Sequence, residues 1–295
     1  MPIGFVLSGG ASLGAIQVGM LHALYERGIA PDLIVATSVG AVNGAFIASR
    51  PPTVSTADAL GDIWRKLHRD DVFPPNLVTG LLGFLGRRSS LLPSSGLRRL
   101  LERHIDFERV EDAAIPLHVI GVDLKSGRER RLSEGDVIEA VLASAAMPAV
   151  FPPVRWGDLE LIDGGVANNT PISHAIELGA TEIYVLPTGY ACHLHTAPSS
   201  ALGMGLHALT LLIQQRLIIE IRAFRDRARL VVLPPPCPLD VTPADFSHAR
   251  ELIERARRDA RAFLAAAPVG RSAVPPVMRD MQTHNAAGRD AEGDK

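Results

Sequence analysis

The apolar positions near the N-terminus come in short runs that alternate with longer amphipathic stretches. Residues 4–7 form a short apolar run, residues 8–10 (Ser-Gly-Gly) follow it, and residues 15–27 have an amphipathic pattern. This order predicts a strand, a glycine loop and a helix. Residues 31–36 and 39–49 repeat the strand and the helix. Two such units in succession predict a parallel sheet with helices packed on its faces.

The rest of the chain continues with the same kinds of element. Further helices are predicted at residues 57–68, 95–105, 136–146, 171–178, 201–227 and 245–266. Further strands are predicted at residues 159–162, 182–186 and 229–234, with a strand pair around a glycine turn at 117–132. No repeat and no linker divides this pattern, so we predict one α/β domain at residues 1–266. Residues 267–295 carry little apolar pattern and are predicted to be a disordered tail.

Composition removes several classes of function. The chain has 295 residues and a net charge of −2, which offers no field to attract nucleic acid, so we expect no nucleic-acid partner. Its two cysteines are too few for a disulfide framework or a cysteine zinc site, and the N-terminus lacks a secretory pattern. We therefore expect a cytoplasmic protein with reduced thiols. The oligomeric state is not predicted.

Two segments suit a membrane surface. No apolar run reaches the roughly 18 to 20 residues that span a bilayer. Residues 77–86 are apolar and glycine-rich, and Arg87 and Arg88 would suit a lipid headgroup. Residues 216–227 form a basic helix, for which we prefer a core-packed face with a salt-bridged solvent face. Transient contact with the inner face of a membrane is the alternative.

Ser38 lies where the second predicted strand passes into its helix. Serine is a preferred N-cap residue, which is one explanation of this position. A tight turn between a strand and a helix also exposes a nucleophilic serine, and it needs small neighbours. The local sequence, Ala36-Thr-Ser-Val-Gly40, is a G-x-S-x-G elbow with Ala36 in the first glycine position. This pentapeptide alone leaves both explanations open.

The first glycine loop, Ser8-Gly-Gly-Ala-Ser-Leu-Gly14, precedes a helix and is suited to binding an anion. A dinucleotide site expects an acidic residue at the end of the second strand, and a P-loop expects a lysine at the helix start. The chain has neither. The oxyanion of an acyl-transfer intermediate remains, and this loop would share one crevice with Ser38 at the carboxyl ends of adjacent strands.

Asp163 is the strongest candidate for a base. It follows a predicted strand and precedes Gly164 and Gly165, although Asp-Gly is also a common turn dipeptide. We expect Asn168 and Asn169 to bond the loop backbone and hold Asp163 in place. A buried aspartate can act directly as general base on a serine, so no histidine, metal or cofactor is required.

Three segments together resemble the patatin-like phospholipase family. They are SGGASLGAIQVGML at 8–21, ATSVGAVNGA at 36–45 and DGGVANNTP at 163–171, and SAAMPAVFPP at 144–153 is similar to a further family segment. The resemblance implies a three-layer α/β/α fold with a mostly parallel sheet. It also implies a lipid acyl hydrolase, acting on lipid or ester substrates, with Ser38 as nucleophile and Asp163 as base.

The resemblance assigns further residues as well. The amides of Gly9, Gly10 and Ala11 would form the oxyanion hole, and the supporting motif residues are Gly14, Ala36, Gly40, Gly164 and Gly165. This chain departs from the family in having alanine at positions 11 and 36, where glycine is usual, and leucine at position 13. An acyltransferase with the same dyad and a non-catalytic scaffold are the alternatives.

Overall fold

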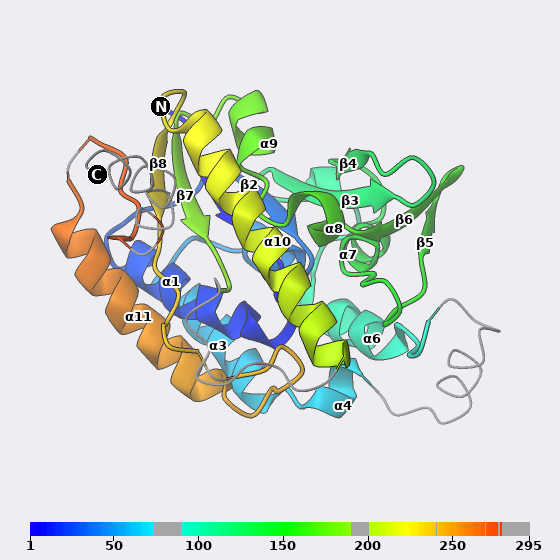
Figure 1. Ribbon diagram of the computed structural model, residues 1–295. Helices are drawn as coiled ribbons and strands as arrows, with labels where there is room; N and C mark the ends of the chain where they lie inside the picture. The colour runs from blue at the N-terminus through cyan, green and yellow to red at the C-terminus, as the bar shows by residue number, and fades with distance from the viewer. Residues whose placement is uncertain (74–89, 190–200, 240, 269, 277, 279–295) are drawn as a thin grey trace, which may run out of the picture.

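One mixed sheet organises the fold (Figure 1). The computed structural model describes residues 1–73, 90–189, 201–239, 241–268, 270–276 and 278. Its eight strands are β1 (Ile3–Leu7), β2 (Leu33–Thr37), β3 (Leu117–Asp123), β4 (Glu129–Leu132), β5 (Val154–Trp156), β6 (Leu159–Asp163), β7 (Glu182–Leu186) and β8 (Arg229–Val232). Their order is β5-β6-β3-β2-β1-β7-β8, with β4 also paired to β3.

The sheet is parallel at its centre and antiparallel at one side. β1 pairs in parallel with β2 and β7, while β2 and β7 pair in parallel with β3 and β8. β3 pairs antiparallel with both β4 and β6, and β5 pairs antiparallel with β6. The predicted hairpin at 117–132 is confirmed as β3 and β4, whereas β5 has no counterpart in the sequence pattern.

Helices cover both faces of the sheet. On the first face lie α1 (Ala15–Tyr25), α2 (Val39–Ala48), α3 (Val54–Lys66), α4 (Arg69–Val72), α6 (Ser95–His104), α7 (Val137–Ser144) and α11 (Ala249–Ala266). On the second lie α9 (Ile172–Glu177) and α10 (Ala201–Phe224), with α8 (Gly165–Asn168) packed against α10. Two short 3-10 helices are η1 (Ala11–Gly14) and η2 (Val110–Asp112). The predicted α/β fold with helices in two layers is confirmed.

The strand residues divide between the two cores because successive side chains of a strand point to opposite faces. Phe5 and Leu7 of β1 join the core beneath α1 and α2, and Val6 between them joins the core beneath α9 and α10. All three are fully buried. A continuous apolar run is therefore what a central strand with two covered faces requires.

The sheet edge at β8 takes in residues from the segment predicted to be a tail. Ala273 forms a parallel bridge with Val231, and Ser272 Oγ accepts the N–H of Leu230 at 3.0 Å. Met278 is buried in the second core. The domain boundary at residue 266 stays a prediction, and residues 279–295 lie outside the described residues.

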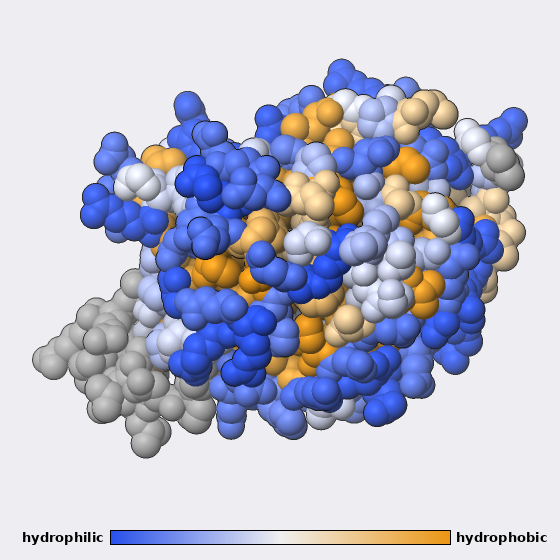
Figure 2. All heavy atoms as spheres, turned by 180° about the vertical axis from the view of Figure 1, so that it is seen from behind, coloured by the Kyte–Doolittle hydropathy of each residue, from blue (hydrophilic) through white to orange (hydrophobic). Residues whose placement is uncertain are grey.

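The structure bears on the expectations about reduced thiols and membrane contact. Cys237 is disulfide-bonded, which contradicts the expectation of reduced thiols. Across the described part of the chain, no helix is long and apolar enough to cross a membrane. Seen from behind, apolar side chains form separate patches among polar ones (Figure 2). The segment at 77–88, one of the two candidates for membrane contact, lies outside the described residues.

Residues 216–224 of the basic helix predicted at 216–227 form the end of α10, and residues 225–227 form a turn after it. Leu217, Ile218 and Ile221 face the core, and Arg216 forms an ion pair with Glu220 at 3.0 Å. This end of α10 therefore has the preferred arrangement of a buried face and a salt-bridged face.

Candidate active site

Ser38 occupies a sharp turn between β2 and α2. Its backbone has φ 55° and ψ −125°, a conformation that residues other than glycine rarely adopt. The turn is tight because α2 begins directly above β1: a Cβ on Gly40 would lie 2.3 Å from the carbonyl oxygen of Leu7. The Ser38 side chain makes no capping hydrogen bond. Ser38 thus takes the N-cap position of α2 without capping the helix through its side chain, and its hydroxyl is left for another partner.

That partner is Asp163. Ser38 Oγ donates a hydrogen bond to Asp163 Oδ2 at 2.6 Å, although the two residues are 125 positions apart in the sequence. Asp163 Oδ1 accepts the N–H of Gly165 at 2.7 Å. Burial raises the pKa of Asp163 to about 6, although both of these hydrogen bonds favour the charged form. The structure thus brings together the two residues that the sequence proposed as nucleophile and base.

Strand register explains how two distant residues meet. Thr37 pairs with Ile120 of β3, and Asp163 pairs with Gly121, the next residue of β3. β4 occupies the opposite side of β3 along this stretch, so β2 and β6 lie on the same side. Since β2 is parallel to β3 and β6 is antiparallel, their carboxyl ends meet head to head. Ser38 and Asp163 stand at that junction.

Ser144 fixes the turn that carries Ser38, a role that the sequence did not reveal. Its Oγ accepts the backbone N–H of Ser38 at 2.9 Å and donates to the carbonyl oxygen of Ile120 at 2.6 Å. Ser144 is fully buried and ends α7. Two residues further on, the backbone carbonyl oxygen of Ala146 accepts the N–H of Asp163 at 3.0 Å. The SAAMP segment therefore positions both members of the pair.

The glycine loop lies beside Ser38. A Cβ on Gly9 would lie 2.9 Å from Ser38 Cβ and 2.4 Å from Asn169 Oδ1, so only glycine fits there. The N–H of Gly9 donates to the carbonyl oxygen of Asn169 at 3.2 Å. Within the described residues the N–H groups of Gly10 and Ala11 make no hydrogen bond. Of the three expected oxyanion donors, these two are free to receive a ligand.

Asn169 and Thr188 hold the loop from outside. Asn169 Nδ2 donates to the carbonyl oxygen of Gly9 at 3.3 Å, and Thr188 Oγ1 donates to the same oxygen at 2.5 Å. Asn168 instead donates to Glu129 Oε2 at 3.0 Å and to Ser173 Oγ at 3.1 Å. The two asparagines therefore bond different partners, and neither is hydrogen-bonded to Asp163 in the described part of the chain.

A buried polar chain ties the loop to the helices. Gln17 Nε2 donates to the carbonyl oxygens of Ser8 and Leu186 at 2.9 and 3.0 Å. Asn43 Nδ2 donates to Gln17 Oε1 at 2.8 Å, and Trp64 Nε1 donates to Asn43 Oδ1 at 2.9 Å. Polar residues in otherwise apolar helices were the only sequence signal for this network. Because its buried donors are paired, it holds the loop rigidly.

The alanines that depart from the family pattern differ in conformation. Ala11 has φ 51°, which favours glycine. Ala36 lies inside β2 in extended backbone, and its Cβ faces Gly44, where an added Cβ would approach it to 3.2 Å. An alanine at position 36 therefore needs no special backbone conformation, and Gly44 makes room for its methyl group.

Two further glycines of the motifs are closely packed. At Gly14, an added Cβ would lie 2.5 Å from Val39 Cγ2, and at Gly165 it would lie 2.7 Å from Asn169 Oδ1.

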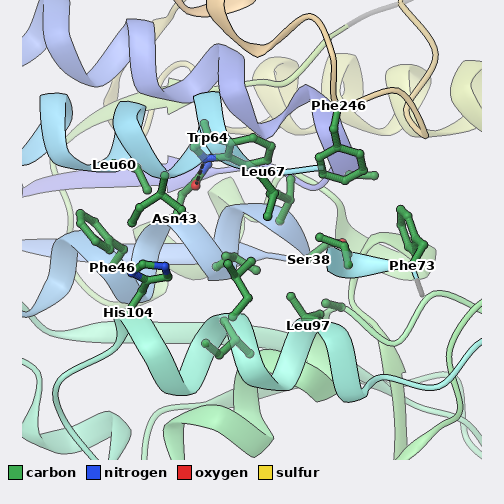
Figure 3. Close-up of a pocket in the computed structure, with 18 of the residues that line it drawn as sticks. Ser38, Asn43, Phe46, Leu60, Trp64, Leu67, Phe73, Leu97, His104 and Phe246 are labelled. Atoms are coloured by element: carbon green, nitrogen blue, oxygen red, sulfur yellow. Dashed lines mark hydrogen bonds between the residues drawn. The ribbon is translucent and has the colours of Figure 1, made fainter. Parts of the chain in front are cut away.

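An apolar pocket opens from Ser38 and Ala11 (Figure 3). Its walls are Val39, Val42, Asn43 and Phe46 from α2; Leu60, Ile63, Trp64 and Leu67 from α3 and its C-cap; and Leu97, Leu100, Leu101 and His104 from α6. The remaining lining residues are Val72, Phe73, Ile105, Ala145, Met147, Phe151 and Phe246.

The described residues contain no group of three or more His, Cys, Asp or Glu side chains placed to hold a metal ion. No histidine among them is hydrogen-bonded to Ser38 or Asp163. His104 lines the pocket, and burial together with Arg103 and Arg50 lowers its pKa, which favours the neutral ring. Among the described residues, the chemistry at the pocket and directly beside it is that of the Ser38 hydroxyl, the buried Asp163 carboxylate and the backbone amides of Gly10 and Ala11.

Known proteins are similar in sequence to part of this chain. The lysophospholipase nte1 of Aspergillus terreus is 29% identical over 195 residues, which cover 63% of this chain and 12% of that protein. Patatin-like phospholipase domain-containing protein 7 of Rattus norvegicus is 30% identical over 190 residues, which cover 63% of this chain and 14% of that protein. The chain therefore spans only a small part of the length of these relatives.

A solved structure and a family model are also similar to this chain. VipD from Legionella pneumophila aligns with a TM-score of 0.43 and 14% identity, over 87% of this chain and 67% of VipD. The model of the family described as patatin-like phospholipase matches residues 5–176. That range is more than half of the chain and includes Ser38, Asp163 and the glycine loop, so the chain belongs to the patatin-like phospholipase family.

Proposed function

We propose that this protein is a serine lipid acyl hydrolase that cleaves fatty acyl esters with Ser38 as nucleophile and Asp163 as base. The observation that carries the proposal is the 2.6 Å hydrogen bond between Ser38 Oγ and Asp163 Oδ2, with Ser38 in the wall of an apolar pocket. The family and the lysophospholipase among its relatives support a lipid ester as the substrate class. Phospholipids, lysophospholipids and simple esters are all within this class.

The acylation step begins when Asp163 takes the Ser38 proton while Oγ attacks the ester carbonyl carbon. Asp163 is suited to this task because burial raises its pKa to about 6, and a general base works best when its pKa is near the working pH of the enzyme. The carbonyl oxygen becomes an oxyanion, and the N–H groups of Gly10 and Ala11 are the donors in this proposal. One such donor contributes roughly 3 to 4 kcal/mol. The protonated Asp163 then gives its proton to the leaving alcohol, and an acyl-enzyme on Ser38 remains.

Deacylation repeats these steps with water. Asp163 takes a proton from a water molecule, the resulting hydroxide attacks the acyl carbon, and the fatty acid leaves as Ser38 recovers its proton. An alcohol in place of water would give acyl transfer with the same residues. Product analysis with added glycerol separates the two outcomes: a glycerol ester as the main product would replace the hydrolase proposal with the transferase.

The test uses purified full-length protein with p-nitrophenyl esters and a fluorophosphonate probe. We expect Ser38→Ala to lower kcat by about five to six orders of magnitude and Asp163→Asn by roughly 10⁴-fold. Asp123→Asn is the matched control, since Asp123 is also a buried aspartate on the sheet, but its carboxylate accepts a hydrogen bond from Ser126 and not from Ser38. Labelling at a residue other than Ser38, or full activity in either dyad variant, would overturn the dyad. Folded protein that neither labels nor hydrolyses esters would instead indicate a scaffold.

A further inference from the structure

The pocket is an elongated channel that runs along α2 from Ser38. Residues on α2 that line it follow the spacing i, i+3, i+4, i+7 (Val39, Val42, Asn43, Phe46), and α3 and α6 repeat this spacing. Residues so spaced lie on one face of a helix, so three helix faces form the walls along their length. In the close-up, Phe46 and His104 lie at one end of the labelled residues, and Ser38 and Leu97 lie toward the other end, where Phe73 is outermost (Figure 3).

The helix gives the length of the channel. Phe46 follows Ser38 by eight positions, and a helix rises 1.5 Å per residue, so the two ends are about 12 Å apart. An extended alkyl chain with C–C bonds of about 1.5 Å in a zigzag would fill this length with roughly nine or ten carbons. The only polar side chain between the two ends on α2 is Asn43, and Trp64, Gln17 and Gly14 already satisfy it.

A fixed polar group stands behind Phe46. The Arg50 guanidinium lies 3.9 Å from the centroid of the Phe46 ring and donates to the Phe46 carbonyl oxygen at 2.7 Å. It also donates to the carbonyl oxygen of His104 at 3.0 Å and to Asp106 Oδ1 at 2.6 Å. These bonds tie the end of α2 to the end of α6. Phe46 is only 5% exposed. Beyond its ring an alkyl chain would meet the ion pair of Arg50 and Asp106, and burial of methylene groups against charged groups is not favourable.

We propose that Phe46, held by Arg50, is the stop of an acyl channel and limits the bound acyl chain to about ten carbons. The proposal rests on the proposed function, because it takes Ser38 as the point where the acyl carbonyl binds. It assigns to this enzyme a preference for medium-chain acyl esters. A longer acyl chain cannot place all of its carbons between Ser38 and Phe46, so its additional carbons gain no contact with the apolar walls.

The first measurement is independent of catalysis. Free fatty acids of six to sixteen carbons are titrated into Ser38→Ala protein by calorimetry, at concentrations below micelle formation. Each methylene that enters an apolar site raises affinity about fourfold. We expect this rise up to about ten carbons and a plateau beyond, since further methylenes find no apolar wall. An affinity that climbs steadily to sixteen carbons would overturn the proposal.

Two substitutions move the limit in opposite directions. Phe46→Leu shortens the stop and is expected to move the plateau outward by about two carbons. Val42→Phe places a ring one turn from Ser38 and is expected to move it inward to about five carbons. Ile47→Val is the matched control: Ile47 is buried on the same helix but does not line the pocket, so its plateau stays unchanged. An unchanged plateau in both Phe46→Leu and Val42→Phe would refute the stop.

Wild-type hydrolysis of p-nitrophenyl esters over the same chain lengths separates the two proposals. Ester hydrolysis with a flat chain-length profile, together with fatty acid affinity without a plateau, removes the channel stop and leaves the hydrolase. Fatty acid binding with the expected plateau but without ester hydrolysis or Ser38 labelling removes the hydrolase and leaves an acyl-binding channel of the proposed length.

Discussion

The turns that carry Ser38 and Asp163 solve the same problem in different ways. Each leaves a strand paired to β3 and enters a helix, and each contains a glycine pressed against a strand carbonyl: a Cβ on Gly40 or on Gly164 would lie 2.3 Å from the oxygen of Leu7 or Ile120. The Ser38 backbone is strained at φ 55°, whereas Gly164 has an ordinary φ of −60°. The serine is thus positioned by its backbone, and the aspartate by burial and by hydrogen bonds to its carboxylate.

This difference implies two different costs to folding. A strained backbone at one residue costs on the order of 1 to 3 kcal/mol, whatever the pH. A buried carboxylate with a raised pKa costs free energy only where it is ionised, so its cost depends on pH. Substitutions can therefore distinguish the two turns. They change the packing of a glycine against a carbonyl oxygen, the charge of Asp163, the hydrogen bond that holds the serine turn, or the backbone conformation.

Gly40→Ala is expected to have the largest effect on stability. Its Cβ would approach the carbonyl oxygen of Leu7 to 2.3 Å, and because that oxygen is backbone, the elbow must shift. We expect a loss of about 3 kcal/mol of unfolding free energy and a fall in kcat of about 100-fold or more. Chemical denaturation and ester kinetics measure both. Gly61→Ala in α3 is the control, where only the end of the Arg65 side chain is near, and about 0.5 to 1 kcal/mol of added stability is expected.

Asp163→Asn is expected to stabilise the protein while it removes activity. The folded pKa of about 6 lies above the unfolded value, so between about pH 4 and 6 the unfolded chain releases a proton that the folded protein retains. Stability therefore falls as pH rises through this window, and asparagine escapes the loss. At pH 7.5 the variant should gain about 2 to 3 kcal/mol, and at pH 4 almost none. Equal gains at both pH values in urea unfolding would contradict a raised pKa.

The same pKa gives a kinetic prediction. Asp163 must be ionised to accept the Ser38 proton, so kcat/KM of the wild-type protein should rise through about pH 6 and level off above it. A pH–rate profile on a p-nitrophenyl ester measures this. A profile that is flat from pH 5 to 8 would exclude Asp163 as the base.

Ser144→Ala tests the anchor of the serine turn. The substitution leaves the buried N–H of Ser38 and the carbonyl oxygen of Ile120 without their shared partner. We expect a loss of about 1 to 2 kcal/mol and a fall in kcat with little change in KM, because the pocket walls are untouched. Partial rescue by Ser144→Thr, which restores a hydroxyl, would mark Ser144 as a positioning residue. A change confined to KM would argue against this role.

Substitution of the two alanines by glycine is expected to have the smallest effects, with opposite signs. Ala11→Gly relieves a left-handed alanine and should stabilise the protein by up to about 1 kcal/mol. Ala36→Gly removes a methyl group from a buried strand and should destabilise it by up to about 1 kcal/mol. Thermal unfolding of both variants measures this pair, and a shift of the same sign in both would contradict the assigned backbone conformations.

The sequence predicted the parts of the fold that depend on local burial. Central strands such as β1 and β2 are covered on both faces, so they appear as apolar runs before amphipathic helices. β5 escaped prediction because its three residues are partly exposed and carry no periodic pattern. The direction of β6 also escaped, since antiparallel pairing to β3 is a long-range choice that no local pattern records.

The candidate site was predictable to a similar extent. Motifs singled out Ser38 and Asp163, and the contact between them follows from their positions at strand ends. Ser144 carries no motif chemistry of its own, and its role depends on where α7 meets β3. The N–H of Gly9 is engaged by a carbonyl 160 residues away, so its use could not be inferred from the glycine loop alone.

The head-to-head meeting of β2 and β6 on β3 has a consequence for the time at which the protein becomes active during synthesis. The end of β2 pairs with residue 120 of β3, and the end of β6, at residue 163, pairs with residue 121. A nascent chain that has not yet exposed β6 has a serine but no carboxylate to ionise it. Reactivity toward a fluorophosphonate would therefore begin only once three remote segments have paired, so labelling of Ser38 would report the time at which β2, β3 and β6 have come together.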